Sequence, residues 1–157
     1  MWKNICDSDV RSMLQEKIGY HYRDEEKLIQ ALTHRSYINE LKVNTGRQHN
    51  ERMEFLGDAV LELVVSDYLY QKYDEKSEGK LTKLRASLVC EPSLAACARS
   101  LGIGECLCLG KGESLTGGRE RDSILSDALE ALIGSIFLDC GLEAASRFIH
   151  NEILQRL

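Results

Sequence analysis

The sequence predicts an all-α fold, and three observations carry that prediction. Apolar residues recur at helical spacing along nearly the whole chain. The alternating pattern of a strand is confined to one short candidate over 106–109. One proline and 12 glycines among 157 residues leave room for long, uninterrupted helices. With 43% apolar and 29% charged residues, a chain of this length can bury one core as a single domain.

Each expected element follows from where the helical spacing starts and stops. In the first half these are a helix from the capping candidates Asp7 to Asp9 up to Gly19, a helix over 25–33, a polar loop over 39–50, and a long helix over 50–72 with Asn50 as candidate N-cap. In the second half they are a helix after Ser77, one with Pro92 in its first turn that ends at Gly102, an irregular glycine-rich stretch over 104–121, a helix over 122–139, and a last helix over 142–157.

Charge and targeting signals exclude several classes of protein. The 20 basic and 25 acidic residues give a net charge of −5, so the chain is no simple polycation for nucleic acid. No apolar run is long enough to span a bilayer, and the first residues lack a secretory signal, so we expect a cytoplasmic protein without a membrane partner. The six cysteines contain no C-x-x-C pair. They are typical of reduced, small buried side chains, with a structural zinc site as the weaker alternative.

The helix expected over 50–72 carries acidic residues on one stripe. Glu51, Glu54 and Asp58 project within an arc of roughly 60° at helical spacing, opposite the apolar face. No lysine or arginine interleaves with them, although a solvated face normally mixes charges. A divalent cation would relieve the repulsion, because hard cations take oxygen ligands. An ordinary acidic surface is the alternative, and this stripe alone does not decide between them.

A second acidic pair lies on the otherwise apolar helix over 122–139. Asp127 and Glu130 are three residues apart and therefore share a face. Ser123 and Gly134 lie near the same direction, which we interpret as small residues that leave space beside the acids. Packed against the first stripe, the pair would complete a carboxylate cluster able to hold one or two Mg²⁺ ions. Periodicity alone does not show that the two helices touch.

Four segments together resemble the ribonuclease III family, whose members cut double-stranded RNA. Residues 49–61 (HNERMEFLGDAVL) closely match the signature segment of that family. Three further segments agree in order and approximate spacing: 31–37 (ALTHRSY), 78–86 (EGKLTKLRA) and 123–134 (SILSDALEALIG). The resemblance covers nearly the whole chain. It implies that 1–157 is a catalytic domain of the bacterial type, with the double-stranded-RNA-binding domain absent from this chain, and we expect a truncated protein.

The resemblance also implies roles for individual residues. Glu54, Asp127 and Glu130 match the Mg²⁺ ligands of the family, and Asp58 matches a catalytic carboxylate that acts with Glu130. Two further acids, Glu51 and Glu78, match auxiliary positions at the edge of the cleft. The aromatic Phe55 matches a residue that inserts into a pocket of the partner subunit. All four central acids are present, which argues against a degenerate relative.

The function implied is that of a Mg²⁺-dependent endoribonuclease, with Mn²⁺ as a possible substitute. It would hydrolyse double-stranded RNA to 5′-phosphate and 3′-hydroxyl ends as a homodimer, in RNA processing that includes ribosomal RNA. A-form RNA is recognised by shape and 2′-hydroxyls across its minor groove, so little sequence preference is expected. Two alternatives stay open: a non-catalytic double-stranded-RNA-binding scaffold of the same fold, and a helical dimerisation module whose acids are simply solvated.

Several basic residues are candidates for RNA contacts outside the acids. The segment over 33–37 contains His34 and Arg35, although a hydrogen-bonded histidine at a helix end is the simpler interpretation of His34. Arg119 and Arg121 follow glycines just before the second acidic helix. A further basic set either contacts RNA phosphates or forms a solvated helix face, and the sequence favours neither: Lys76, Lys80, Lys83 and Arg85. Asp67 projects near the core-facing stripe, and the sequence does not explain why an acid occupies that position.

Overall fold

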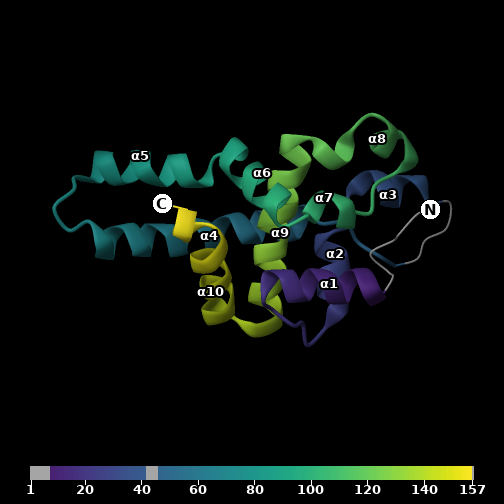
Figure 1. Cartoon of the computed structure of the whole chain (residues 1–157), viewed down its shortest axis with the longest axis horizontal. Helices are drawn as coiled ribbons and strands as arrows, with labels where there is room; N and C mark the ends of the chain where they lie inside the picture. Colours follow the sequence, from purple (N-terminus) through teal and green to yellow (C-terminus); the bar gives the residue numbers. More distant parts are fainter. Residues whose placement is uncertain (1–7, 42–45, 157) are drawn as a thin grey trace.

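The all-α prediction is confirmed by a computed structural model, which describes residues 8–41 and 46–156 (Figure 1). Within these ranges the α-helices are α1 (Ser8–Ile18), α2 (Glu25–Ala31), α3 (Arg35–Glu40), α4 (Glu51–Lys72), α5 (Glu78–Val89), α6 (Glu91–Ser100), α7 (Ile103–Cys106), α8 (Lys111–Leu115), α9 (Asp122–Cys140) and α10 (Leu142–Glu152). Two short 3₁₀ helices cover Gly118–Glu120 and Leu154–Arg156.

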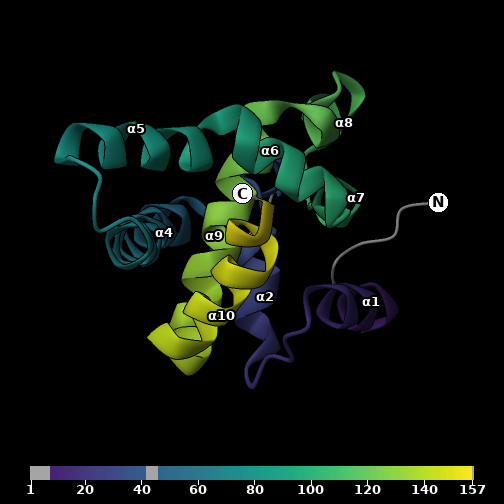
Figure 2. The same cartoon turned by 60° about the vertical axis from the view of Figure 1, so that its left-hand side comes forward.

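The helix α9 is the centre of the molecule. It packs against α4, α6, α10 and α2, and the two views show these helices arranged around it (Figures 1 and 2). Within the stretch 124–136 every residue is buried except Asp127 and Glu130, which are half-buried. Because acidic side chains are almost never fully buried without a partner, these two mark the place where the core helix meets solvent.

Two glycines allow α4 and α9 to cross in backbone contact. A Cβ atom added to Gly57 would lie 1.7 Å from the backbone oxygen of Glu130, and one added to Gly134 would lie 2.3 Å from that of Met53. Any side chain at either position would push the helices apart. The sequence-based interpretation of Gly134 as space beside the acids was therefore wrong, since its small size serves the helix crossing.

The second half of α4 and α5 form a hairpin that extends away from this centre (Figure 1). No residue of α5 is buried, and its apolar side chains are only half-buried against the core. Arg85 links the two helices, because its guanidinium lies 3.0 Å from the Glu62 carboxylate and donates to the Ser66 hydroxyl at 2.9 Å. The α5 helix is therefore held mainly by its α4 neighbour.

Most of the helix ends were predicted correctly, since the local signals for them are strong. Gly19, Gly102 and Gly141 all have positive φ angles directly after or near a helix end. Asn50 occupies the N-cap position of α4 as expected. However, its side chain does not cap the helix but donates to the Ala31 carbonyl at 3.0 Å, which joins the start of α4 to α2. The candidate cap Asp7 lies outside the described residues.

Short elements were the main errors of the sequence analysis. No helix was expected over α3, which runs two residues into the loop expected over 39–50, and the irregular stretch expected over 104–121 contains most of α7, all of α8 and a 3₁₀ helix. The strand candidate reduces to one parallel bridge between Thr33 and Cys108, with Cys106 inside α7 instead. The last helix ends at Glu152 rather than 157. The elements α3, α7 and α8 are too short to show helical periodicity, so tertiary contacts decide their conformation.

Two side-chain expectations also changed. Cys90 and Cys140 are exposed rather than buried, whereas Cys97 and Cys108 are buried, and all four are free thiols; Cys6 lies outside the described residues. Asp67 is exposed and does not continue the core-facing stripe of α4. No helix among the described residues is long and apolar enough to cross a membrane.

Replacing Gly57 by Ala should destabilise the fold by about 2 kcal/mol or more, because the methyl group would overlap the Glu130 backbone and separate α4 from α9. Chemical denaturation followed by circular dichroism measures the change. Gly79→Ala on α5 is the matched control: its added Cβ meets no atom within 4 Å, so helix propensity should stabilise it by up to about 1 kcal/mol. Equal effects of the two changes would contradict the proposed role of Gly57.

Candidate functional site

The crossing of α4 and α9 brings the two predicted acidic groups together. Glu54 and Asp58 lie on α4 on either side of Gly57, and Asp127 and Glu130 lie on α9 before Gly134. Since the backbones touch at these glycines, the four carboxyl groups are placed on neighbouring helix surfaces. The sequence could suggest this cluster, and the packing of α4 on α9 shows it.

Glu54 and Asp127 form the first carboxyl pair. The pKa of Glu54 is raised to about 7, chiefly by partial burial and then by the charge of Asp127, its hydrogen bond to Glu54, and the charges of Glu51 and Asp58. Burial also raises the pKa of Asp127 above its ordinary value. Each carboxyl group therefore ionises less readily beside the other than it would alone in water.

Glu130 and Asp58 form the second pair. The pKa of Glu130 is raised to about 9, chiefly by burial and then by the hydrogen bond and charge of Asp58. The charges of Glu54 and Asp127 act on Glu130 in the same direction, so the two pairs are one electrostatic group. Asp58 is the exposed member, whereas the other three are half-buried.

The donor set suits a hard divalent cation. All four groups are carboxyls, and none of them forms an ion pair with a basic side chain in the described ranges 8–41 and 46–156. Desolvated acids without basic partners are costly, and a bound cation would compensate them. Among these same residues, however, no three acidic, histidine or cysteine side chains already surround one common metal position. The carboxyl side chains would have to rotate for a cation to bind.

The other predicted site residues fall in three different places. Glu51 begins α4 beside this cluster, and its carboxylate lies 3.4 Å from the Arg35 guanidinium. Glu78 begins α5, at the far end of the hairpin, where it accepts a hydrogen bond from Thr82 at 2.7 Å. Glu78 therefore lies away from the carboxyl cluster of the same chain (Figure 1). Phe55 is 82% exposed.

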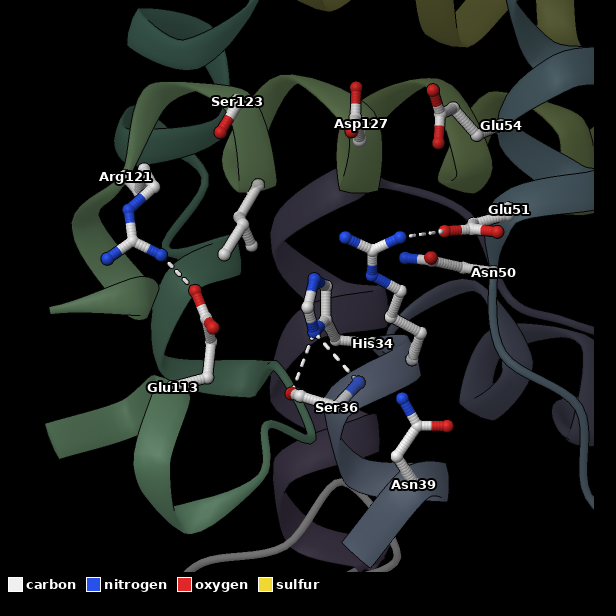
Figure 3. A pocket seen from close by; sticks show the side chains of 12 residues that line it. His34, Ser36, Asn39, Asn50, Glu51, Glu54, Glu113, Arg121, Ser123 and Asp127 are labelled. Carbon is white, nitrogen blue, oxygen red and sulfur yellow. Dashed lines mark hydrogen bonds and ion pairs between the residues drawn. The ribbon is translucent and has the colours of Figure 1, made fainter. Parts of the chain in front are cut away.

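A polar pocket of about 550 Å³ adjoins Glu54 and Asp127 (Figure 3). The acids lie along one side, Arg121 and Glu113 form an ion pair on a second side, and Ser36 and Asn39 lie opposite the acids. Sequence reasoning did not select Glu113, Asn39 or Ser123 as site residues. No periodic pattern links them, because they reach the pocket from three separate elements.

The structure gives different roles to two of the basic residues that were candidates for RNA contacts. Arg119 is structural, since its guanidinium donates to the carbonyls of Leu107 at 2.6 Å and Gly104 at 3.1 Å. His34 is the N-cap of α3, and its Nδ1 accepts from the Ser36 backbone N–H at 3.1 Å, which confirms a hydrogen-bonded histidine at a helix end. Partial burial also lowers the pKa of His34, so the ring stays neutral around pH 7.

Comparison with known proteins agrees with this architecture. A family model described as ribonuclease-III-like matches residues 24–157, which include every acid of the cluster. The chain belongs to the ribonuclease III family. Ribonuclease 3 of Geobacillus kaustophilus is 54% identical over 144 residues, covering 92% of this chain and 58% of the relative. Ribonuclease 3 of Bacillus cereus ATCC 14579 is 54% identical over 145 residues, covering 92% and 59%.

Solved structures show the same fold for the ribonuclease III nuclease domain. That domain from Campylobacter jejuni is 44% identical to this chain, with a TM-score of 0.84 over 93% of this chain and 95% of the other. A second structure of that domain was solved in relation to flexibility in a region involved in dimer formation. It is 46% identical to this chain with a TM-score of 0.80, covering 89% of this chain and 96% of the other. The chain spans less than two thirds of the length of the curated relatives named above.

Replacing Glu130 by Gln should raise the melting temperature in EDTA, and the gain should grow between about pH 5 and pH 9. The pKa of Glu130 is raised from 4.5 to about 9, so the folded protein holds this proton more tightly than the unfolded chain. Stability therefore falls as pH rises through this window, and glutamine avoids the loss because it cannot ionise.

Circular dichroism melting curves at several pH values measure this gain. Glu105→Gln, at an exposed position of α7, is the control and should show no pH-dependent gain. A difference between wild type and Glu130→Gln that stays constant with pH would contradict the burial of an ionisable group at this position.

Proposed function

We propose that this domain is a Mg²⁺-dependent endoribonuclease that hydrolyses double-stranded RNA to 5′-phosphate and 3′-hydroxyl ends, with RNA processing as its role. The observation that carries the proposal is the group formed by Glu54, Asp58, Asp127 and Glu130 at the α4–α9 crossing of a ribonuclease III family chain. A non-catalytic RNA-binding scaffold has no need to keep four acids together, three of them half-buried. The cytoplasmic location expected from the sequence stays a prediction.

In this proposal Glu54, Asp127 and Glu130 hold the cation and Asp58 completes the site. A cation held there, Mg²⁺ or Mn²⁺ in its place, would supply the positive charge that makes a phosphodiester susceptible to attack by water. The half-buried carboxylates fix their oxygens on two rigid helices, which limits the reorganisation that catalysis requires. Asp58, the exposed member, is placed to accept a hydrogen bond from water entering from solvent.

The hydrolysis itself adds water across the bond between phosphorus and the 3′ oxygen. The oxygen of water stays on phosphorus as part of the 5′-phosphate, and a proton reaches the departing 3′ oxygen. Glu51 lies at the edge of the cluster and is proposed as an auxiliary acid that positions Arg35. Glu78, at the far end of the hairpin, is proposed as an auxiliary acid only for RNA that extends along α5 or reaches it from a second subunit.

We also propose that two copies assemble through Phe55. An exposed aromatic side chain of this size is unfavourable in water. Phe55 borders a largely apolar pocket of about 610 Å³ that includes Met53, Leu56 and Leu138. Insertion of each Phe55 into the pocket of the other subunit would bury both, as a symmetric dimer requires. The nuclease domain from Campylobacter jejuni has a region involved in dimer formation, which supports assembly of two copies in general.

Replacing Glu130 by Gln should reduce cleavage of a long RNA duplex at least about 100-fold in saturating Mg²⁺, because a neutral amide oxygen binds a hard cation poorly. Cleavage assays with Mg²⁺ against EDTA, followed by end-group analysis, measure activity and product chemistry. As a second readout, Mg²⁺ should raise the melting temperature of wild type more than that of Glu130→Gln.

The exposed variant Glu105→Gln serves as control and should cut like wild type. Wild-type cleavage that persists in EDTA would contradict the metal site, and full activity of folded Glu130→Gln would contradict the carboxylate cluster. Binding of duplex RNA without any cleavage by wild type would favour the scaffold alternative.

Replacing Phe55 by Glu should shift the protein from dimer to monomer in analytical ultracentrifugation, since a carboxylate would be desolvated in the apolar pocket of the partner. The fold should survive, because Phe55 is exposed within its own subunit. Leu115→Glu is the control: that leucine is 87% exposed on α8 and should leave assembly unchanged. A Phe55→Glu protein that remains dimeric would refute this interface.

A further inference from the structure

Two basic segments far apart in the sequence converge on the pocket beside the acids. Arg35 begins α3 and Arg121 immediately precedes α9, yet both line the same pocket of about 550 Å³. Glu54 and Asp127 line it as well. The pocket therefore continues directly from the candidate metal site, and its basic groups are supplied by elements other than α4.

Both arginines keep hydrogen-bonding capacity for a ligand. The guanidinium of Arg35 makes one long contact, 3.4 Å to Glu51, and its side chain is 64% exposed. Arg121 is held between the Glu113 carboxylate and the Thr116 carbonyl, which lies 3.0 Å from Nη2. A guanidinium is a planar fork of five N–H donors, so one contact at Arg35 and two at Arg121 leave other donors available.

His34 adds a neutral donor between them. Its Nδ1 accepts from the Ser36 N–H, and the Ser36 hydroxyl oxygen, 2.7 Å away, itself accepts from the Gly110 N–H at 2.9 Å. In the neutral ring the proton must then sit on Nε2. Figure 3 shows the second ring nitrogen of His34 pointing away from Ser36 and into the pocket. The backbone of α3 and the loop before α8 thereby fix the direction of one more N–H donor.

The charges in the pocket divide into two sets. Glu51 and Glu113 are each paired with an arginine, whereas Glu54 and Asp127 have no basic partner among the residues that the structure describes. With a cation on the unpaired acids, the rest of the pocket presents N–H donors and no uncompensated negative charge. Such a surface is suited to an anion with several acceptor oxygens, and planar guanidinium groups match a phosphate well.

We propose that this pocket binds a backbone phosphate of the RNA strand, next to the phosphate that is cleaved. The proposal rests on the proposed function and extends it: Arg35, Arg121 and His34 are positioning residues that fix the register of the strand on the acids. Phosphate contacts position a nucleic acid without reading its sequence, so the pocket adds affinity and alignment rather than base preference. Stability is a poor explanation for Arg35, because exposed ion pairs of this kind contribute little.

Kinetics of duplex cleavage by arginine variants test the pocket. The substrate is an RNA duplex of about 30 base pairs in saturating Mg²⁺, and the variants are Arg35→Gln and Arg121→Gln. Each should raise KM roughly tenfold with little change in kcat, and reduce the slope of log(kcat/KM) against log salt by about 1, as expected for one lost phosphate contact. Arg35→Lys should restore most of the slope, because it keeps the charge.

A chemical change in the RNA locates the phosphate. Single neutral methylphosphonates are placed in turn at each phosphate within a few nucleotides of the cleaved bond. In wild type one position should weaken cleavage roughly tenfold, and in Arg35→Gln the same substitution should have no further effect. The control is Arg23→Gln: Arg23 is exposed, and its backbone N–H contacts Asp139, about 18 Å along α9 from Asp127. It should behave as wild type.

Each outcome decides for or against the pocket. Unchanged KM and salt slope in Arg35→Gln, or additive effects of the variant and the methylphosphonate, would overturn the phosphate site while leaving the endoribonuclease proposal intact. A wild-type protein that does not cleave the duplex at all would overturn the proposed function instead. If Arg121→Gln disturbs the loop before α9, Arg35→Gln still decides, because its exposed side chain makes no buried contact.

Discussion

Backbone contact between α4 and α9 at Gly57 and Gly134 is the constraint on which the rest of the molecule depends. The helices approach until a Cβ atom at Gly57 would overlap the carbonyl of Glu130. Such an approach maximises packing along α9, whose residues from 124 to 136 are buried apart from its two acids. It also determines which polar groups meet, because the four carboxyls lie within two helical turns of the two glycines. Core packing and the candidate chemistry are therefore produced by the same contact.

The acids make this contact electrostatically costly. Burial and mutual repulsion raise the pKa of Glu54 to about 7 and that of Glu130 to about 9, so the group favours protons or a cation over free ionisation. Perturbed carboxyls of this kind cluster at functional sites. The extensive apolar surface buried around α9 is large enough to hold them in place, which is how a stable core supports an unfavourable cluster at its surface.

The surroundings of the cluster divide the proposed functions of this domain among different elements. The carboxyls come from two long, rigid helices, whereas the basic groups of the neighbouring pocket come from the start of α3 and the segment before α9. Phe55 lies one residue after Glu54 and, from the exposed side of α4, points to assembly with a second copy. One helix therefore links the proposed metal site, core packing and the proposed dimer contact, and in the neighbouring pocket Glu51 and Glu113 are each neutralised by an arginine.

The sequence by itself determined the all-α class, the long helices, their glycine stops, and the family through the segment around Glu54 and Asp58. These features depend on local periodicity or on contiguous motifs. Only the tertiary structure decided that Gly134 serves a helix crossing, that Arg119 is structural, that Glu78 lies away from the other acids, and that Arg35 and Arg121 share a pocket. The physical reason is that local spacing sets which face a side chain occupies, whereas the partner of that face is chosen by packing between segments distant in the chain.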